Sequence, residues 1–178
     1  MKLDPLLMSP LQQFVLVGLR TLIGWHFCYE GYVKLLHPAW SLDGHPLPGW
    51  SSAGYLKAAT GPFAAVFHAL SDAAWLAQLD FAVALLLLVI GISLLLGLFT
   101  QFGCAGAAAM LSIFYLSAIP LGLPDAHTEG SYLIVNKNLI ELASVAVLLV
   151  FRTGRIAGLD GWLGRARVVA AAAKEATV

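Results

Sequence analysis

The chain has 178 residues, of which 60% are hydrophobic and 11% charged, and its mean hydropathy is +0.83. A soluble domain usually carries about 25% charged residues, so this chain has more apolar surface than a domain of its size can hide from water. We expect lipid to cover the remainder. The net charge of zero and the lack of a basic run argue against nucleic acid as a partner.

The first apolar segment, residues 11–36, begins with a helix-start signal. The Ser-Pro-Leu-Gln sequence at residues 9–12 offers an N-cap serine, a proline at the first helical position and a glutamine three residues after the cap. The segment is long enough to span a bilayer. It ends in a charged stretch rather than a small-residue cleavage site, which favours a retained helix over a signal peptide.

Four ionisable residues interrupt this segment. A charged side chain in a bilayer costs a few kcal/mol, so these residues should face other helices and find partners. Glu30 and Lys34 are four residues apart and can pair along a helix. Two glycines on the same face would let another backbone or a flat ligand come close. At 100° per residue, an arc of about 120°, with His26 at its edge, holds Arg20, Gly24, Phe27, Glu30, Gly31 and Lys34.

The remaining elements follow in chain order. Residues 37–74 form a long connection rich in aromatic residues, in which 52–60 and 62–70 are expected to be short helices at the membrane interface. The later spans are expected at 75–99, 104–119 and 131–151, followed by a basic tail, 152–178, in which 160–174 could lie at the interface as a helix. The sequence therefore predicts one all-α membrane domain, a four-helix bundle.

The distribution of Lys and Arg predicts the orientation of this bundle. The tail from Arg152 onward holds five of the ten basic residues and two acids, whereas the connection 37–74 holds Lys57 alone. Because cytoplasmic loops carry the excess of basic residues, the tail should be cytoplasmic, and with four spans so should the N-terminus. We therefore expect a multi-pass protein of the cell (inner) membrane, with the 37–74 loop outside.

Polar residues of all four expected spans fall at one depth, in the outer half of the bundle, while the cytoplasmic half is almost purely apolar. Lys137 and Glu141 are four residues apart and can pair along the fourth helix. Two interpretations stay open: these charges pair to fix helix register, or they line a pocket for a polar headgroup and its protons. Arg20 is expected near the middle of the membrane, and the polar set is completed by His26, Glu30, Lys34, Asp80, Tyr115, Asn136, Lys137 and Glu141.

Resident redox groups are not expected in this chain. Cys28 and Cys104 have no metal-type spacing and should lie near opposite membrane faces. His26 alone lies within a span, which argues against a haem held by two histidines, and no glycine-rich nucleotide motif is present. We therefore expect no haem, flavin or metal site, and any redox chemistry should come from a partner or from bound molecules.

Several short motifs resemble the DoxX/DoxD family, over roughly residues 16–160. In the first helix they are Leu19-Arg20, Gly24, Phe27, Glu30-Gly31 and Lys34-Leu35; later ones are the Gly-Ile-Ser-Leu-Leu-Leu-Gly-Leu-Phe run at 91–99, the Asn-Lys-Asn-Leu-Ile-Glu run at 136–141 and Gly158-Leu159-Asp160. The resemblance implies a four-helix membrane protein. It further implies a subunit of a thiosulfate:quinone oxidoreductase, which passes electrons from thiosulfate to membrane quinone.

The leading hypothesis is a quinone-binding subunit of a membrane oxidoreductase. Arg20 and Lys137 would donate hydrogen bonds to the quinone carbonyls, with His26 as a proton relay. Glu30 and Glu141 would exchange protons with the outer face. The substrate-binding set would be completed by Gly24 and Gly31, which give the ring room, and by Lys34, Asp80, Tyr115 and Asn136.

Two rivals come from other classes. The first is a non-catalytic anchor or assembly subunit, which docks an outer-face enzyme through the 37–74 loop. The second is a small-solute permease, which ranks lowest because the inner half lacks polar residues to form a path. The sequence leaves open the identity of a partner protein and whether the chain forms a homo-oligomer.

Overall fold

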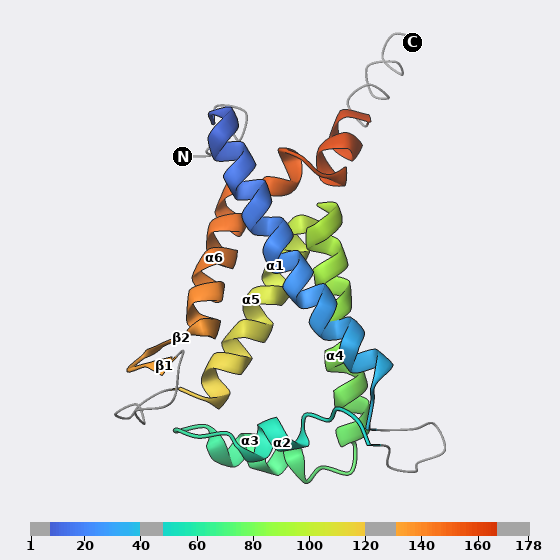
Figure 1. Cartoon of the computed structure of the whole chain (residues 1–178), viewed down its shortest axis with the longest axis vertical. Helices are drawn as coiled ribbons and strands as arrows, with labels where there is room; N and C mark the ends of the chain where they lie inside the picture. The colour runs from blue at the N-terminus through green and yellow to red at the C-terminus, as the bar shows by residue number, and fades with distance from the viewer. Residues whose placement is uncertain (1–7, 40–47, 120–130, 167–178) are drawn as a thin grey trace, which may run out of the picture.

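A computed structural model describes residues 8–39, 48–119 and 131–166, and these are mostly helical. The prediction of an all-α fold is therefore confirmed. Two short helices, α2 (Ala53–Lys57) and α3 (Ala64–Ser71), connect the first two long ones. The four long helices are α1 (Pro10–Leu36), α4 (Leu76–Leu96), α5 (Thr100–Ser117) and α6 (Lys137–Phe151), and they pack in the cyclic order α1, α4, α5, α6 (Figure 1).

Helix α1 begins as its sequence predicts. The Ser9 hydroxyl accepts a hydrogen bond from the Gln12 amide, and the Gln12 side chain accepts one from the Ser9 amide, at 3.3 and 2.9 Å. This reciprocal capping box satisfies two of the amides that a helix start leaves unpaired. The predicted start is confirmed.

Glycines bring α1 and α4 into backbone contact. A Cβ atom at Gly31 would lie 2.3 Å from the Leu88 amide nitrogen, and one at Gly91 would lie 2.2 Å from the Cys28 amide nitrogen. Gly24 is nearly as close to Leu95. Of the two expectations for Gly24 and Gly31, the close approach of another backbone is therefore met, since α4 fills the space that a ligand would need.

The hairpin of α4 and α5 turns more tightly than predicted. Gly97 and Phe99 both adopt positive φ, at 61° and 51°, so α4 ends before residue 99 and α5 starts four residues before the expected position 104. The core lies between the four long helices. Its fully buried members include Leu94, Cys104, Val145 and Leu148.

The fourth long helix is shorter than the expected 131–151. Residues Ser131–Tyr132 (β1) and Val135–Asn136 (β2) pair as an antiparallel hairpin, with Leu133 at φ 58°. Asn136 has an extended backbone, and its side chain accepts a hydrogen bond from the Leu139 amide at 3.1 Å. Asn136 is therefore the N-cap of α6 rather than a residue within it.

The two ends of the molecule differ (Figure 1). The start of α1 lies at the same end as the segment after α6, which includes a 3-10 turn at Thr153–Arg155 and a helical stretch at 159–166; the rest of the expected interfacial helix lies outside the described residues. We call this the basic end. At the other end, α2 and α3 lie across the long helices, and we call residues 48–71 the cap.

All four long helices expose large apolar side chains. Examples are Leu22 on α1, Val89 on α4, Phe102 on α5 and Val150 on α6. Among the described helices, one, Leu76–Leu96, is long and apolar enough to cross a membrane by length and composition. Of the four expected spans, α4 therefore meets this criterion. Helix α1 carries charged residues, and α6 has 15 residues.

Candidate functional site

A cavity of about 410 Å³ lies inside the bundle, directly beneath the cap. This volume falls in the range of pockets that bind small molecules. Phe27, Leu87, Met110, Leu111 and Phe114 contribute to a continuous apolar wall from α1, α4 and α5. Such a wall suits a ligand whose body is apolar.

Five basic or acidic side chains, all from α1 and α6, line another side of this cavity. His26, Glu30 and Lys34 come from successive turns of α1, since residues four apart share a helix face. Lys137 and Glu141 come from the first two turns of α6. The structure thus brings these five predicted residues to one cavity, and we call them the polar seam.

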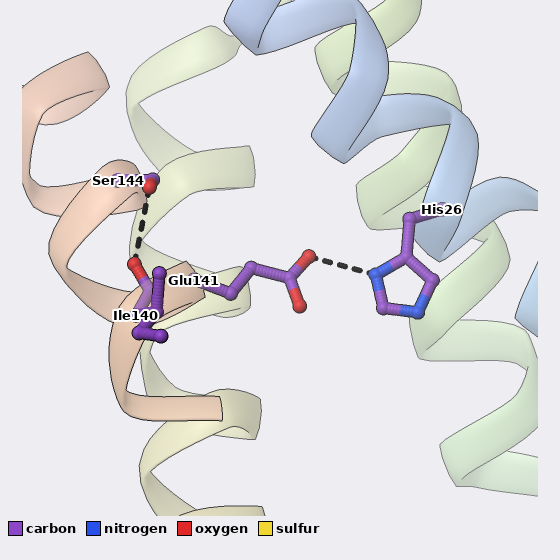
Figure 2. Close-up of polar contacts among 4 residues, drawn as sticks. All are labelled: His26, Ile140, Glu141 and Ser144. Atoms are coloured by element: carbon purple, nitrogen blue, oxygen red, sulfur yellow. Dashed lines mark hydrogen bonds and ion pairs between the residues drawn. The ribbon is translucent and has the colours of Figure 1, made fainter. Parts of the chain in front are cut away.

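The strongest contact across the polar seam joins His26 to Glu141. The His26 Nδ1 atom lies 2.7 Å from the Glu141 Oε1 atom, and Figure 2 shows the two side chains reaching toward each other from α1 and α6. The His26 side chain is 52% exposed and that of Glu141 is 17% exposed. The expected pairing of Glu141 with Lys137 is wrong, because Glu141 takes its partner from α1.

The other charges of the polar seam differ in their partners. Glu30 and Lys34 form the expected ion pair along α1, which is confirmed. The Lys34 ammonium also lies 5.1 Å from the centre of the Trp50 ring. Among the described residues Lys137 has no hydrogen-bond or ion-pair partner, so its ammonium is available to a ligand.

Asp80 lies outside the cavity lining and holds the cap in place. Its side chain is 2% exposed and accepts hydrogen bonds from the Ser51 hydroxyl at 2.6 Å and the Ser52 amide at 3.0 Å, as well as from the Ser52 hydroxyl. A carboxylate with three donors is well stabilised. The expectation that Asp80 binds substrate is corrected: it positions Ser52, which does line the cavity.

A second attachment fixes the cap to the end of α5. The Tyr55 hydroxyl donates to the Phe114 carbonyl at 3.0 Å and also meets the Ser117 hydroxyl, while the Thr60 amide donates to the Ser117 carbonyl. Burial raises the pKa of the Tyr55 phenol, which therefore stays protonated as a donor.

Tyr115 and Asn136 also lie outside the cavity lining. The Tyr115 hydroxyl donates to the Ile134 carbonyl at 2.8 Å, and the Asn136 amide donates to the Ala118 carbonyl at 3.3 Å. Both bonds tie the β1–β2 hairpin to the end of α5. The expectation that these two residues bind substrate is corrected to a structural role.

Arg20 is the largest departure from the expected site. Its side chain is buried at the basic end, where Nη1 donates to the Thr153 carbonyl at 2.9 Å and Nη2 to the Ala157 carbonyl at 2.6 Å. Asp160 accepts from the Phe99 and Thr100 amides at 2.7 and 2.9 Å. Arg20 therefore does not face the pocket, and the basic end of the bundle holds a buried charged residue where almost purely apolar packing was expected.

The structure adds residues that were not among the predicted site residues. Asn138, on α6, and Met110, on α5, line the cavity, as do Trp50, Ser52 and Phe67 from the cap. Aromatic residues in the 37–74 loop indicated an interfacial segment, but their position over the pocket depends on tertiary contacts. No group of three or more His, Cys, Asp or Glu side chains in the described ranges could hold a metal ion.

Comparison with known proteins does not identify a family. No family model, curated protein or solved structure matches the chain. The chemistry of this site must therefore be argued from its own residues.

Proposed function

We propose that the chain is a multi-pass membrane protein in which α1, α4, α5 and α6 all cross the bilayer. The support is the exposed apolar surface on every one of these helices, which lipid would cover. The charges on α1 do not contradict this, since Arg20 is buried and the others line the cavity. Helix α6 is about 22 Å long, and the exposed Leu133 and Ile134 before it extend its apolar surface. Both termini would be cytoplasmic, at the basic end, in the inner membrane.

The ligand that this pocket suits best is a membrane quinone. The observation that carries this proposal is one cavity with an apolar wall on one side and the polar seam on the other. A quinone has a flat apolar ring and two carbonyl oxygens that need hydrogen-bond donors. Lys137 and the imidazole of His26 are donors of the right kind, and both lie at the same cavity.

Reduction of a quinone takes up two electrons and two protons. Electrons would come from a partner protein or a small donor outside the chain, since the proposed role here is to bind and protonate. The His26–Glu141 contact offers a proton path, because a proton can move between Nδ1 and Oε1 at 2.7 Å. Arg20 has no part in this proposal, because it does not line the cavity and its Nη1 and Nη2 atoms donate to carbonyls at the basic end.

The chain would then be one subunit of a quinone-linked oxidoreductase, as its resemblance to the DoxX/DoxD family implies. A thiosulfate:quinone type of activity fits that resemblance. The pocket supports the quinone half of such a reaction, and an outer-face or membrane partner would supply the other half.

Quinone titration of the purified protein in lipid nanodiscs tests this function, with Trp50 fluorescence as one readout because Trp50 lines the cavity. We expect Lys137→Met to weaken binding about tenfold, which is about 1.4 kcal/mol. Lys57→Met is the matched control, since Lys57 is exposed on the cap and does not line the cavity. Equal affinities in the two variants, or no binding by the unaltered protein, would contradict the proposal.

A second candidate function is that of an anchor for an outer-face enzyme. It is favoured by apolar side chains that the cap and the following turn expose, namely Phe63, Val66 and Trp75. Native purification followed by mass spectrometry would identify such a partner. Loss of that partner in Phe63→Ser/Val66→Ser, with quinone binding retained, would assign docking to the cap and quinone binding to the pocket.

A further inference from the structure

In the described part of the chain, the boundaries between neighbouring long helices differ in how closely the helices contact each other. At the α1–α4 boundary the backbones touch at Gly31 and Gly91. At the α4–α5 boundary a Cβ on Gly103 would lie 2.5 Å from the Ser93 hydroxyl, but this contact is near the turn at the basic end and not beside the cavity. The α5–α6 boundary is closed at the cap end by the hydrogen bonds of Tyr115 and Asn136 to the neighbouring backbone. The backbone contact at the α1–α4 boundary and the hydrogen bonds at the cap end of the α5–α6 boundary leave no passage there for a ligand of ring size.

The cap closes the end of the cavity that points away from the basic end. It is fixed to α4 through Asp80 and to α5 through Tyr55 and Thr60. It also joins the end of α1, since the Trp50 amide donates to the His37 carbonyl at 2.7 Å and the Ala39 amide to the Trp50 carbonyl at 2.9 Å. Side chains of the cap, among them Leu56 and Phe67, then form the cavity's end wall.

The α1–α6 boundary is different. In the described part of the chain, one side-chain hydrogen bond joins these two helices, that between His26 and Glu141. His26 is half exposed at this boundary although it lines the cavity, so the cavity reaches the outer surface of the bundle there. Figure 2 shows the contact crossing the space between α6 and α1, with α4 and α5 behind it.

We infer that the ligand enters sideways from the bilayer, through the polar seam, and that it is an amphiphile whose apolar tail remains in lipid. This inference rests on the proposed function, because the surface around the seam meets lipid only if α1 and α6 cross the membrane. The ring passes between α1 and α6 and stops against the apolar wall at Met110 and Phe114. The tail lies beside His26, whose contact with Glu141 must open for entry.

The chemistry of the seam explains why a polar contact closes a passage that faces lipid. Apolar side chains closing this passage would pack against a lipid chain as favourably as against one another. The His26–Glu141 contact instead gives the entering carbonyl group donors and acceptors at the entrance, which offsets the loss of its interactions at the membrane interface.

Site-specific labelling tests the route. In a Cys28→Ala background, with the buried Cys104 left in place, single cysteines are introduced at His26, Trp25 or Lys57 and modified with either a methylthio group or a bulky thiol reagent. Trp25 is the matched control, since it neighbours His26 on α1, is 61% exposed and does not line the cavity. Both labelled proteins lack the imidazole of His26, because cysteine has replaced it. The difference between the two labels therefore reports only the bulk of the group at the seam.

We expect the bulky label at position 26 to slow association of a long-tailed benzoquinone about tenfold relative to the methylthio label. The same comparison at positions 25 and 57 should change the rate less than about twofold. Slowing at position 57 without slowing at position 26 would overturn the inference, because it would place entry at the cap. Equal rates at all three positions would overturn it as well.

A second probe separates this inference from the quinone proposal. A long-chain alcohol with a photoreactive diazirine at its head end needs no quinone recognition, and it should label cavity residues such as Met110 after illumination. The bulky group at position 26 should abolish that labelling. Labelling that depends on position 26 without any quinone binding would refute the quinone proposal and keep the route. Quinone binding with labelling independent of position 26 would refute the route alone.

Discussion

The glycine contact between α1 and α4 allows a graded test of how the bundle is held together. At Gly31 a methyl group would meet the Leu88 amide nitrogen at 2.3 Å and the Ala84 carbonyl oxygen at 2.7 Å. Non-bonded heavy atoms reach their optimum near 3.5–4.0 Å, so the helices must move apart by about 1 Å to accept it. Both atoms belong to the α4 backbone, which cannot turn aside as a side chain can.

Four Gly→Ala variants form a series with an internal control. Overpacking typically costs about 1–3 kcal/mol, and we expect Gly31→Ala and Gly91→Ala to lie at the upper end of this range. Gly24→Ala should cost less, since its nearest contact is 2.9 Å. Gly18 has nothing within 4 Å of its Cβ position, so Gly18→Ala should stabilise by about 0.5–1 kcal/mol through helix propensity.

Thermal unfolding in one detergent, followed by circular dichroism, ranks the four variants. Quinone affinity measured on the folded fraction gives an independent readout, since a displaced α1 also displaces His26. If Gly31→Ala and Gly18→Ala unfold at the same temperature, the close contact of α1 with α4 is not a feature of the protein in solution. The reasoning from backbone proximity would then be refuted.

Three further predictions concern polar contacts. A double-mutant cycle with His26→Gln and Glu141→Gln should give a coupling free energy of about 0.2–1 kcal/mol, as expected for a partly exposed pair, and a value of zero would contradict the contact. Asp80→Asn should destabilise by about 1–3 kcal/mol and speed amide hydrogen exchange across the cap more than at the basic end; uniform exchange would contradict its role. Arg20→Leu should lower the free energy of unfolding by about 2 kcal/mol or more, because two carbonyls lose their donor. Quinone affinity should stay unchanged, and a weakened affinity would indicate that Arg20 belongs to the binding site.

The features that depend on neighbouring residues could be predicted from the sequence. The capping box at Ser9 and the pairing of Glu30 with Lys34 need only a few consecutive residues, and both are present in the structure. The polar side of the pocket followed from helical periodicity, which gives the direction and depth of each side chain. Periodicity does not say what lies opposite, and so it leaves open whether Gly24 and Gly31 face a ligand or another backbone; in the structure they face α4.

Other features depend on partners far away in the sequence. The acceptors for Arg20 lie 133 and 137 residues later, and a long flexible side chain can reach toward either end of a helix. The pattern of the apolar run at 132–135 favours strand and helix about equally, so the sequence does not show where α6 begins. In the structure, the extended backbone of Asn136 marks the boundary between the hairpin and α6. The cap's position over the cavity could not be predicted because its aromatic residues carry no periodic signal.

The contacts of Asp160 set an order of events during synthesis of the chain. The α4–α5 hairpin is complete once residue 117 has been made, but the first amides of α5 wait for a carboxylate sixty residues further along. The same late segment brings the carbonyls that receive Arg20. A chain that stopped shortly after α6 would therefore leave two amides at the start of α5 and the guanidinium of Arg20 without these partners.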